Sequence, residues 1–175
     1  IQSRIDDIYY RKRRNYQEQL EAFGQKLAGM ETTREIITAF REILSDTIQP
    51  TSIFVFMHDT QSDTYISYEG TDTDILFTND SGVVELLSGE QQVFCLEPGV
   101  PWPAQIRSER ARINILRSVV IASIGVSDGK PIGFITLGYP KRGTAMYTFE
   151  EVRFVNNLIS QVSVSMERAQ VIASY

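Results

Sequence analysis

The chain has 175 residues and a mass of 19.9 kDa, which suits one domain with an extra helix and is too short for two full domains. Hydrophobic residues make up 42% and charged residues 22% of it, so a wholly disordered chain is excluded. The net charge of -5 opposes nucleic-acid binding, and the single cysteine and single histidine exclude an internal disulfide and most metal or catalytic sites built from these residues.

The first thirty residues predict one long helix. Its apolar side chains follow the alternating three- and four-residue spacing of a heptad, which only Lys12 interrupts. Four consecutive cations, Arg11 to Arg14, suit a position beside anionic lipid headgroups, although a coiled coil with a solvated charged face explains them as well.

The middle of the chain, residues 31–105, holds two basic and thirteen acidic side chains. It opens with a predicted helix that Thr32 or its neighbour caps and that Pro50 ends. β-Branched and aromatic residues then predict strands at 52–58 and 64–68, joined by a polar turn.

Residues 70–117 have a less regular pattern. We expect a short helix near 82–87 and a brief strand at 93–96. Three prolines mark the irregular loop that follows. The arginine-rich segment 107–117 is expected to be partly helical.

The last third of the chain predicts a hairpin and a long helix. Strands are expected at 118–126 and 132–139, because Asp128-Gly129 between them is a strong tight-turn signal. Thr148 is the expected N-cap of the final helix, which carries a second heptad seam. This element order predicts an α+β domain: an antiparallel sheet of five to six strands with helices packed on it, flanked by long N- and C-terminal helices.

Two stretches carry a family resemblance. Residues 130–138 (KPIGFITLG) and 147–151 (YTFEE) are followed by Phe154 and a helix that includes 161–169. This pattern resembles the GAF domain, a small-molecule sensing module of signalling proteins, and the resemblance implies a GAF-like sensory domain over residues 31–172. Such a resemblance identifies a fold better than it identifies a ligand.

A second resemblance concerns residues 5–16 (IDDIYYRKRRNY), with Leu20 and Phe23 after them. They resemble the juxtamembrane helix of bacterial sensor histidine kinases, which implies a signalling helix over residues 1–30. By this resemblance a membrane region precedes the fragment and a kinase follows it, so we expect a cytoplasmic domain of an inner-membrane protein.

The two heptad seams predict a mechanism. Exposed seams need a partner, so we expect a parallel homodimer with the terminal helices of both subunits in one bundle, and a signal passed on as a change in their packing. The function expected is a non-catalytic sensory and dimerisation module. The expected dimer contacts are Tyr16, Leu20, Phe23, Leu27, Val152, Val155, Ile159, Val162 and Met166.

Enzymatic and cofactor-binding functions find little support. Cys95 stands alone, so the several-cysteine cycle of GAF-type free methionine sulfoxide reductases is impossible within one chain. Bilin-binding GAF domains use a cysteine followed by histidine, whereas Leu96 follows Cys95 here. Phe149 directly precedes the acidic pair, so the spacing of the cyclic-nucleotide signature is not met. The alternative function is a haem or chromophore sensor or a cyclic-nucleotide-binding regulatory domain. Haem bound through His58 is a weak alternative, because one imidazole has no placed partners. We therefore expect no metal and no resident cofactor.

The segment 70–117 is the predicted wall of a ligand pocket, since it usually covers one sheet face in GAF folds. It combines apolar or aromatic groups with guanidinium groups, a mixture that suits a small anionic or aromatic ligand. The alternative is a collapsed pocket whose arginines pair with the acidic middle. The candidates are Phe77, Phe94, Cys95, Trp102, Ile106, Arg107, Arg110, Arg112, Ile113 and Arg117.

Overall fold

The computed structural model describes residues 2–70, 72–143 and 145–174, without the side chains at 2, 3, 5, 6, 8–10, 12, 13 and 70. Part of the N-terminal heptad and of the cationic run therefore lies outside the described side chains. The chain begins with α1 (Gln2–Ala28) and α2 (Thr33–Thr47). Thr32 caps α2 as its sequence predicts, because its hydroxyl accepts a 3.2 Å hydrogen bond from the Glu35 backbone N–H.

A six-stranded antiparallel sheet forms the centre of the molecule, in the order β3-β2-β1-β8-β5-β4. The central pair, β1 and β8, sets Phe56 opposite Phe134. A separate two-stranded ribbon, β6 with β7, extends the β5–β8 hairpin. The strands are β1 (Ile53–Asp59), β2 (Thr64–Ser67), β3 (Phe77–Thr78), β4 (Val93–Cys95), β5 (Val120–Ser123), β6 (Val126–Ser127), β7 (Lys130–Pro131) and β8 (Gly133–Leu137).

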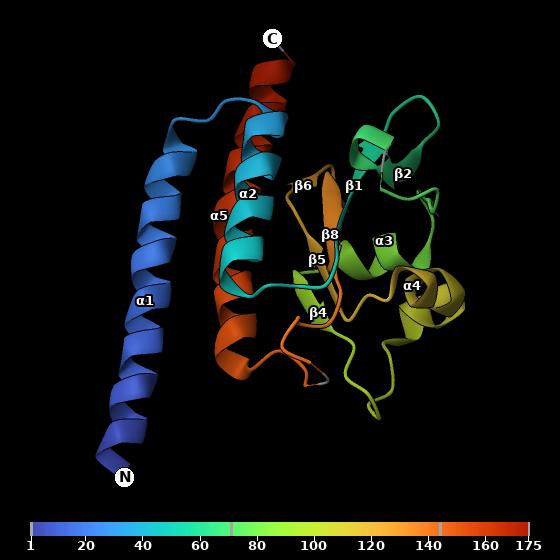
Figure 1. Ribbon diagram of the computed structural model, residues 1–175. Coiled ribbons are helices and arrows are strands. Elements are labelled where there is room, and N and C mark those ends of the chain that lie inside the picture. The colour runs from blue at the N-terminus through green and yellow to red at the C-terminus, as the bar shows by residue number, and fades with distance from the viewer. Residues whose placement is uncertain (1, 71, 144, 175) are drawn as a thin grey trace.

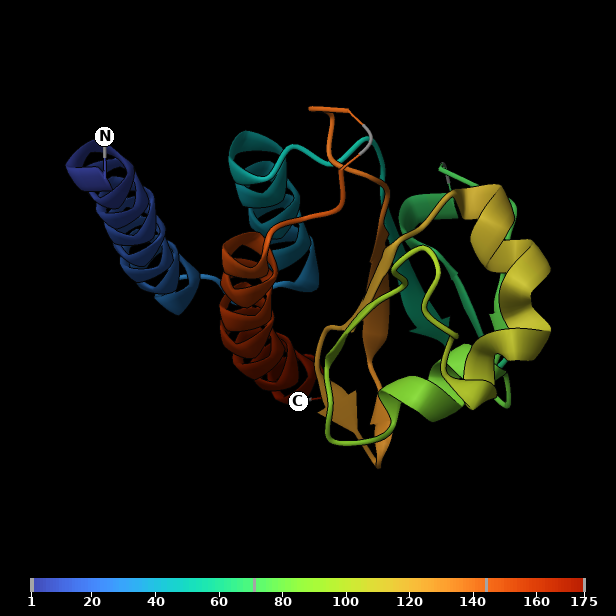
Figure 2. The same ribbon diagram turned by 90° about the horizontal axis from the view of Figure 1, so that it is seen from below.

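Helices cover both faces of this sheet (Figures 1 and 2). On one face lie α2 and α5 (Phe149–Ala173), and α1 packs outside them against α5. The other face carries short elements, which are α3 (Gly82–Leu87), η2 (Ala104–Glu109) and α4 (Arg110–Leu116). The turn η1 (Tyr68–Gly70) lies on the helical side, where Tyr68 packs against the core and Glu69 pairs with Arg34 of α2 at 3.2 Å. The fold is thus the predicted α+β class with both terminal helices in place.

Each sheet face has its own hydrophobic core. The helical face buries Phe40, Val55, Ile159 and Val162, each at most 1% exposed. The opposite face buries an aromatic cluster under α3 and η2. Because both sides of the sheet are covered, β5 and β8 are buried along their whole lengths.

Two local features differ from the sequence expectation. The predicted strand 118–126 ends early, because Gly125 has φ +100 and its chain packs against Met166 of α5. The hairpin therefore divides into the sheet pair β5–β8 and the ribbon β6–β7. Strand β3 was not predicted; it is only two residues long and is held to β2 through the pairs Thr64–Thr78 and Tyr65–Phe77.

Candidate functional site

The sheet face under segment 70–117 is filled with side chains. Phe56 lies between two other rings, with centroids 5.0 Å from Phe134 and 5.2 Å from Phe77. Two of the predicted pocket residues, Ile106 and Ile113, join these rings and are at most 1% exposed. The structure thus brings Phe77, Ile106 and Ile113 together as core.

The other three uncharged candidates are half-buried and divide between the two faces. Phe94 and Trp102 pack at the margin of the aromatic core, whereas Cys95 packs against the core on the helical side. Burial and the nearby Glu97 raise the pKa of the Cys95 thiol, which keeps it protonated and unreactive.

The four candidate arginines lie on the surface. Arg110 lies over the Trp102 ring at 5.0 Å, and Arg107 donates a 3.3 Å hydrogen bond to the Trp102 backbone oxygen. Arg112 pairs with Glu109 at 2.9 Å. Arg117 ends α4 in the left-handed conformation. Within the described part of the chain, none of the four pairs with a carboxylate of residues 31–105.

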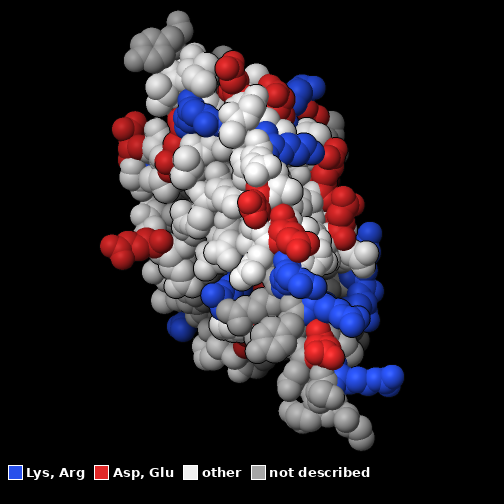
Figure 3. Space-filling model, turned by 90° about the vertical axis from the view of Figure 1, so that its left-hand side faces the viewer, with Lys and Arg blue, Asp and Glu red and all other residues white. Residues whose placement is uncertain are grey.

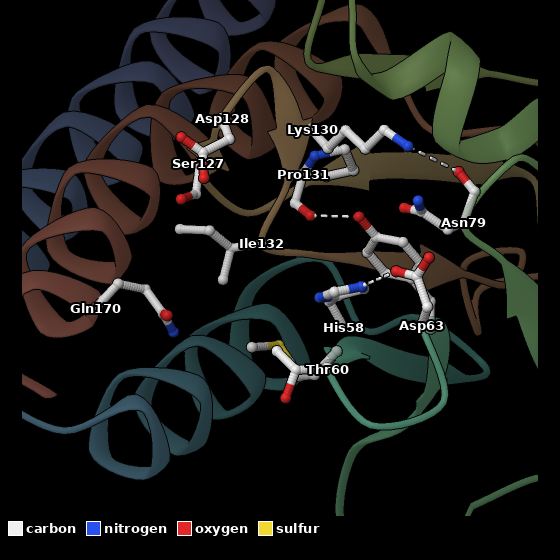
Figure 4. A pocket seen from close by; sticks show the side chains of 12 residues that line it. His58, Thr60, Asp63, Asn79, Ser127, Asp128, Lys130, Pro131, Ile132 and Gln170 are labelled. Carbon is white, nitrogen blue, oxygen red and sulfur yellow. Dashed lines mark hydrogen bonds and ion pairs between the residues drawn. The ribbon is translucent and has the colours of Figure 1, made fainter. Parts of the chain in front are cut away.

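A cavity of about 410 Å³ opens at the far end of the sheet, where β1, the β6–β7 ribbon and the last turns of α5 meet (Figure 4). Its floor is apolar and consists of Met57, Ile132 and the Tyr65 ring. Around this floor stand polar side chains from segments far apart in the sequence. They are Thr60, Asp63, Asn79, Ser127, Asp128, Lys130 and Gln170.

Hydrogen bonds within the wall hold one side of this cavity rigid. His58 Nε2 and Asp63 Oδ1 are 2.8 Å apart, and the His58 ring lies against Tyr65 with centroids 5.1 Å apart. Tyr65 donates a 2.6 Å hydrogen bond to the Pro131 carbonyl, and burial, with a smaller effect of Asp63, raises the pKa of Tyr65 to about 12. The phenol is therefore a structural donor at neutral pH.

The β6–β7 ribbon is tied to the C-terminal helix beside the cavity. The Val126 backbone N–H donates a 3.0 Å hydrogen bond to the carboxylate of Glu167. Gln170, one turn further along α5, lines the cavity itself. A molecule bound in the cavity would thus contact the sheet and the end of α5 at once.

The second half of α1 contacts α5. Tyr16 stacks on Phe154 with ring centroids 4.6 Å apart. Gln161 donates a 3.1 Å hydrogen bond to the Leu20 carbonyl, and Arg168 donates one of 3.1 Å to the Leu27 carbonyl. Leu20 and Leu27 lie about two turns apart on α1, so the two bonds join the helices at separate levels.

The predicted seam residues therefore pack within one subunit. Tyr16, Leu20 and Val152 are half-buried at the edge of the helical-face core. The remaining six are at most 4% exposed; they are Phe23, Leu27, Val155, Ile159, Val162 and Met166. Figure 3 looks onto the α1 side, where basic and acidic groups surround uncharged surface and the basic ones gather toward the beginning of α1.

Two further features of the described residues bear on metal binding and on membrane insertion. No group of three His, Cys, Asp or Glu side chains there is close enough to hold a metal ion. In the acidic loop after η1, Asp72 pairs with Arg41 at 2.8 Å, while Asp74 and Asp80 are exposed. Among the described helices, none is both long and apolar enough to cross a membrane.

Comparison with known proteins identifies the fold. No protein-family model and no curated protein matches the sequence, but 62 chains of solved structures match it. GAF domains recur among them. The chain has the GAF fold.

Three of these structures show the range of proteins that share this GAF fold. A methyl-accepting chemotaxis protein fragment has a TM-score of 0.63 and 19% identity, over 87% of this chain and 99% of its own. The free methionine-R-sulfoxide reductase of Neisseria meningitidis has a TM-score of 0.61 and 14% identity, over 92% of this chain and 93% of its own. The GAF domain of a Bacillus halodurans two-component sensor histidine kinase has a TM-score of 0.56 and 14% identity, over 82% of this chain and 99% of its own.

Sequence reasoning did not find the cavity residues. In the sequence His58 is an isolated imidazole, Asp128 belongs to a tight turn, and Lys130 opens the segment 130–138 that carries the family resemblance. The one usable signal was the tight Asp-Gly turn, which places polar side chains at the end of a hairpin. Nothing local in the sequence indicates that this hairpin end meets both the β1–β2 turn and α5.

Proposed function

We propose that this chain is a non-catalytic sensory and dimerisation module of a signal-transduction protein of the two-component sensor histidine kinase type. In this proposal it receives a small-molecule or membrane-derived signal and passes it on through its terminal helices. The observation that supports the proposal is the contact of the second half of α1 with α5, made by Tyr16, Gln161 and Arg168. A displacement of one helix must change the packing of the other, because their contacts are shared.

The proposed homodimer uses the outward side of the terminal helices, since their heptad seams are already occupied within the subunit. Four large apolar side chains of α5 are exposed, with Phe149 at 77%, Val164 at 65%, Val171 at 56% and Ile172 at 44%. A bundle of α1 and α5 from two subunits would remove these side chains from water. We place the membrane region and the kinase of the proposed parent protein before and after this fragment.

Light scattering of the purified protein tests the dimer. We expect twice the chain mass for the wild type and a shift to monomer for Val164→Asp, because a carboxylate would be buried in the bundle. Ile115→Asp is the matched control, since Ile115 is 67% exposed on α4, on the opposite side of the sheet. A wild type that stays strictly monomeric at high concentration refutes this part of the proposal.

An absorption spectrum separates this function from that of a haem or chromophore sensor. The proposal expects no visible band in the protein as purified from its host, because the aromatic core fills the sheet face that segment 70–117 covers. A visible band that survives gel filtration contradicts the proposal. A reductase function is tested by turnover of free methionine sulfoxide, which we expect to be absent in the wild type and unchanged by Cys95→Ser.

A further inference from the structure

We infer that the cavity between β1, the β6–β7 ribbon and α5 is a binding site for a basic α-amino acid. This inference rests on the proposed sensory function and names its ligand. The cavity lies at the end of the sheet, away from the filled face under segment 70–117. Its volume of about 410 Å³ falls within the range of small-molecule sites.

The charges of the wall are complementary to those of such a ligand. Three charged side chains have capacity left for a partner: Lys130, Asp63 and Asp128. A basic amino acid carries one carboxylate and two cationic groups, so each charge of the ligand has one opposite charge in the wall. Charge-assisted hydrogen bonds of this kind are stronger than neutral ones.

The α-carboxylate and α-ammonium groups fit the side of the cavity that holds Lys130 and Asp63. The Lys130 ammonium donates a 3.4 Å hydrogen bond to the Asn79 carbonyl. Two of its three N–H donors are left for a ligand. One oxygen of Asp63 is held by His58 at 2.8 Å, and the other oxygen, which has no hydrogen bond to the residues that the structure describes, can accept from an ammonium. Figure 4 shows these groups on the same side of the cavity.

The cationic side chain of the ligand fits the opposite side of the cavity. Asp128 stands there at the ribbon turn with Ser127 next to it, and Gln170 lies on the same side of the cavity, apart from them (Figure 4). The side chains of Asp128, Ser127 and Gln170 are exposed and have no partner in the described part of the chain.

The apolar stem of the ligand would cross Met57 and Ile132, which form the floor between the two sides of the cavity.

The position of this site connects ligand binding to the output helix. Gln170 belongs to α5, and Glu167 one turn before it already holds the ribbon at Val126. A ligand that joins Asp128 to Gln170 adds a second link between the ribbon and α5. It therefore favours whichever packing of α5 keeps the two together.

Isothermal titration calorimetry with L-arginine and L-lysine tests the assignment. We expect saturable binding of both, and binding about tenfold weaker for citrulline, which lacks the side-chain charge, and for agmatine, which lacks the carboxylate. Lys130→Met should weaken L-arginine about tenfold and leave agmatine unchanged, whereas Asp128→Asn should remove the preference for L-arginine over citrulline. Lys141→Met, at an exposed lysine outside the cavity, is the control.

Two results would overturn the inference: no binding of either L-arginine or L-lysine at millimolar concentration, or L-arginine binding that neither cavity variant alters. Light scattering of the same samples keeps this test separate from the proposed function. A dimer that binds no amino acid refutes the ligand alone, while a monomer that binds L-arginine through Lys130 refutes the dimer alone.

Discussion

Arg142 holds the carboxylate of Glu151 through two hydrogen bonds of 2.6 Å, one from each terminal nitrogen of its guanidinium. Glu151 also accepts a 2.8 Å hydrogen bond from the Thr148 backbone N–H, which completes the capping box at the start of α5. The loop after β8 is thereby fixed to the N-terminus of α5.

Replacing Arg142 should loosen this junction. Arg142→Met leaves the Glu151 carboxylate, whose side chain is 7% exposed, without its cation. We expect a loss of about 1–3 kcal/mol in the free energy of unfolding, less than for a fully buried pair because Arg142 is 43% exposed. Urea denaturation measures it, and Lys141→Met is the neighbouring control; equal stabilities of the two variants would contradict the prediction.

The same pair gives a pH dependence. Burial by itself raises the pKa of Glu151, but the hydrogen bonds from Arg142 and Thr148 outweigh it and hold the pKa below its usual value. The ionised Glu151 therefore contributes fully to the free energy of unfolding above the pKa of about 4.3 that a carboxyl group has in the unfolded chain. This contribution is lost as the pH falls through the lower pKa that Glu151 has in the folded protein. The stability difference between wild type and Arg142→Met should shrink over that interval, and a constant difference down to pH 3 would be inconsistent with this coupling.

The elements that the sequence predicted are those whose causes are local. The caps of α2 and α5 are set by Thr32 and Thr148, each with a glutamate three residues later. The short helix 82–87 follows directly from Ser81, whose hydroxyl accepts from the Val84 backbone N–H. In each case a hydroxyl and a nearby backbone N–H are enough to fix the boundary.

The features that the sequence did not predict depend on distant segments. The aromatic core needs Phe56, Phe77 and Phe134 from three strands, and only the sheet register brings these rings together. The heptad seams have the correct spacing, but spacing alone does not distinguish packing within a subunit from packing between subunits. Polar residues of the cavity come from the β1–β2 turn, the β6–β7 turn and α5, and no local pattern links them.

Gly82 should tolerate no side chain, because α3 approaches η2 closely at this point. A Cβ built on Gly82 would lie 1.7 Å from the Gln105 backbone oxygen, so Gly82→Ala must push the two elements apart. We expect a loss of about 1–3 kcal/mol from this overpacking. Gly89→Ala is the control, because its Cβ would meet only the Leu86 oxygen at an ordinary 3.6 Å, and thermal denaturation compares the two; a Gly82→Ala protein as stable as Gly89→Ala would disprove the close approach.

Tyr16 should control how firmly the first half of α1 is attached. Its ring stacks on Phe154 near the start of α5. Tyr16→Ala removes this stacking and is expected to cost about 1–2 kcal/mol, whereas Tyr16→Phe keeps it. Hydrogen exchange of the α1 amides should accelerate in Tyr16→Ala alone, and equal exchange rates in the two variants would show that another contact holds the helix.

Cys95 should react slowly until the pH is high. Burial raises the pKa of its thiol and Glu97 raises it further, so the thiolate fraction at neutral pH is below that of an ordinary cysteine, whose pKa is about 8.5. The rate of alkylation by iodoacetamide should reach half its maximum above that pH in the folded protein and near it in urea, where the environment is lost. A folded-state midpoint at or below the value in urea would mean that a nearby cation stabilises the thiolate, and the disfavoured redox function would then have physical support.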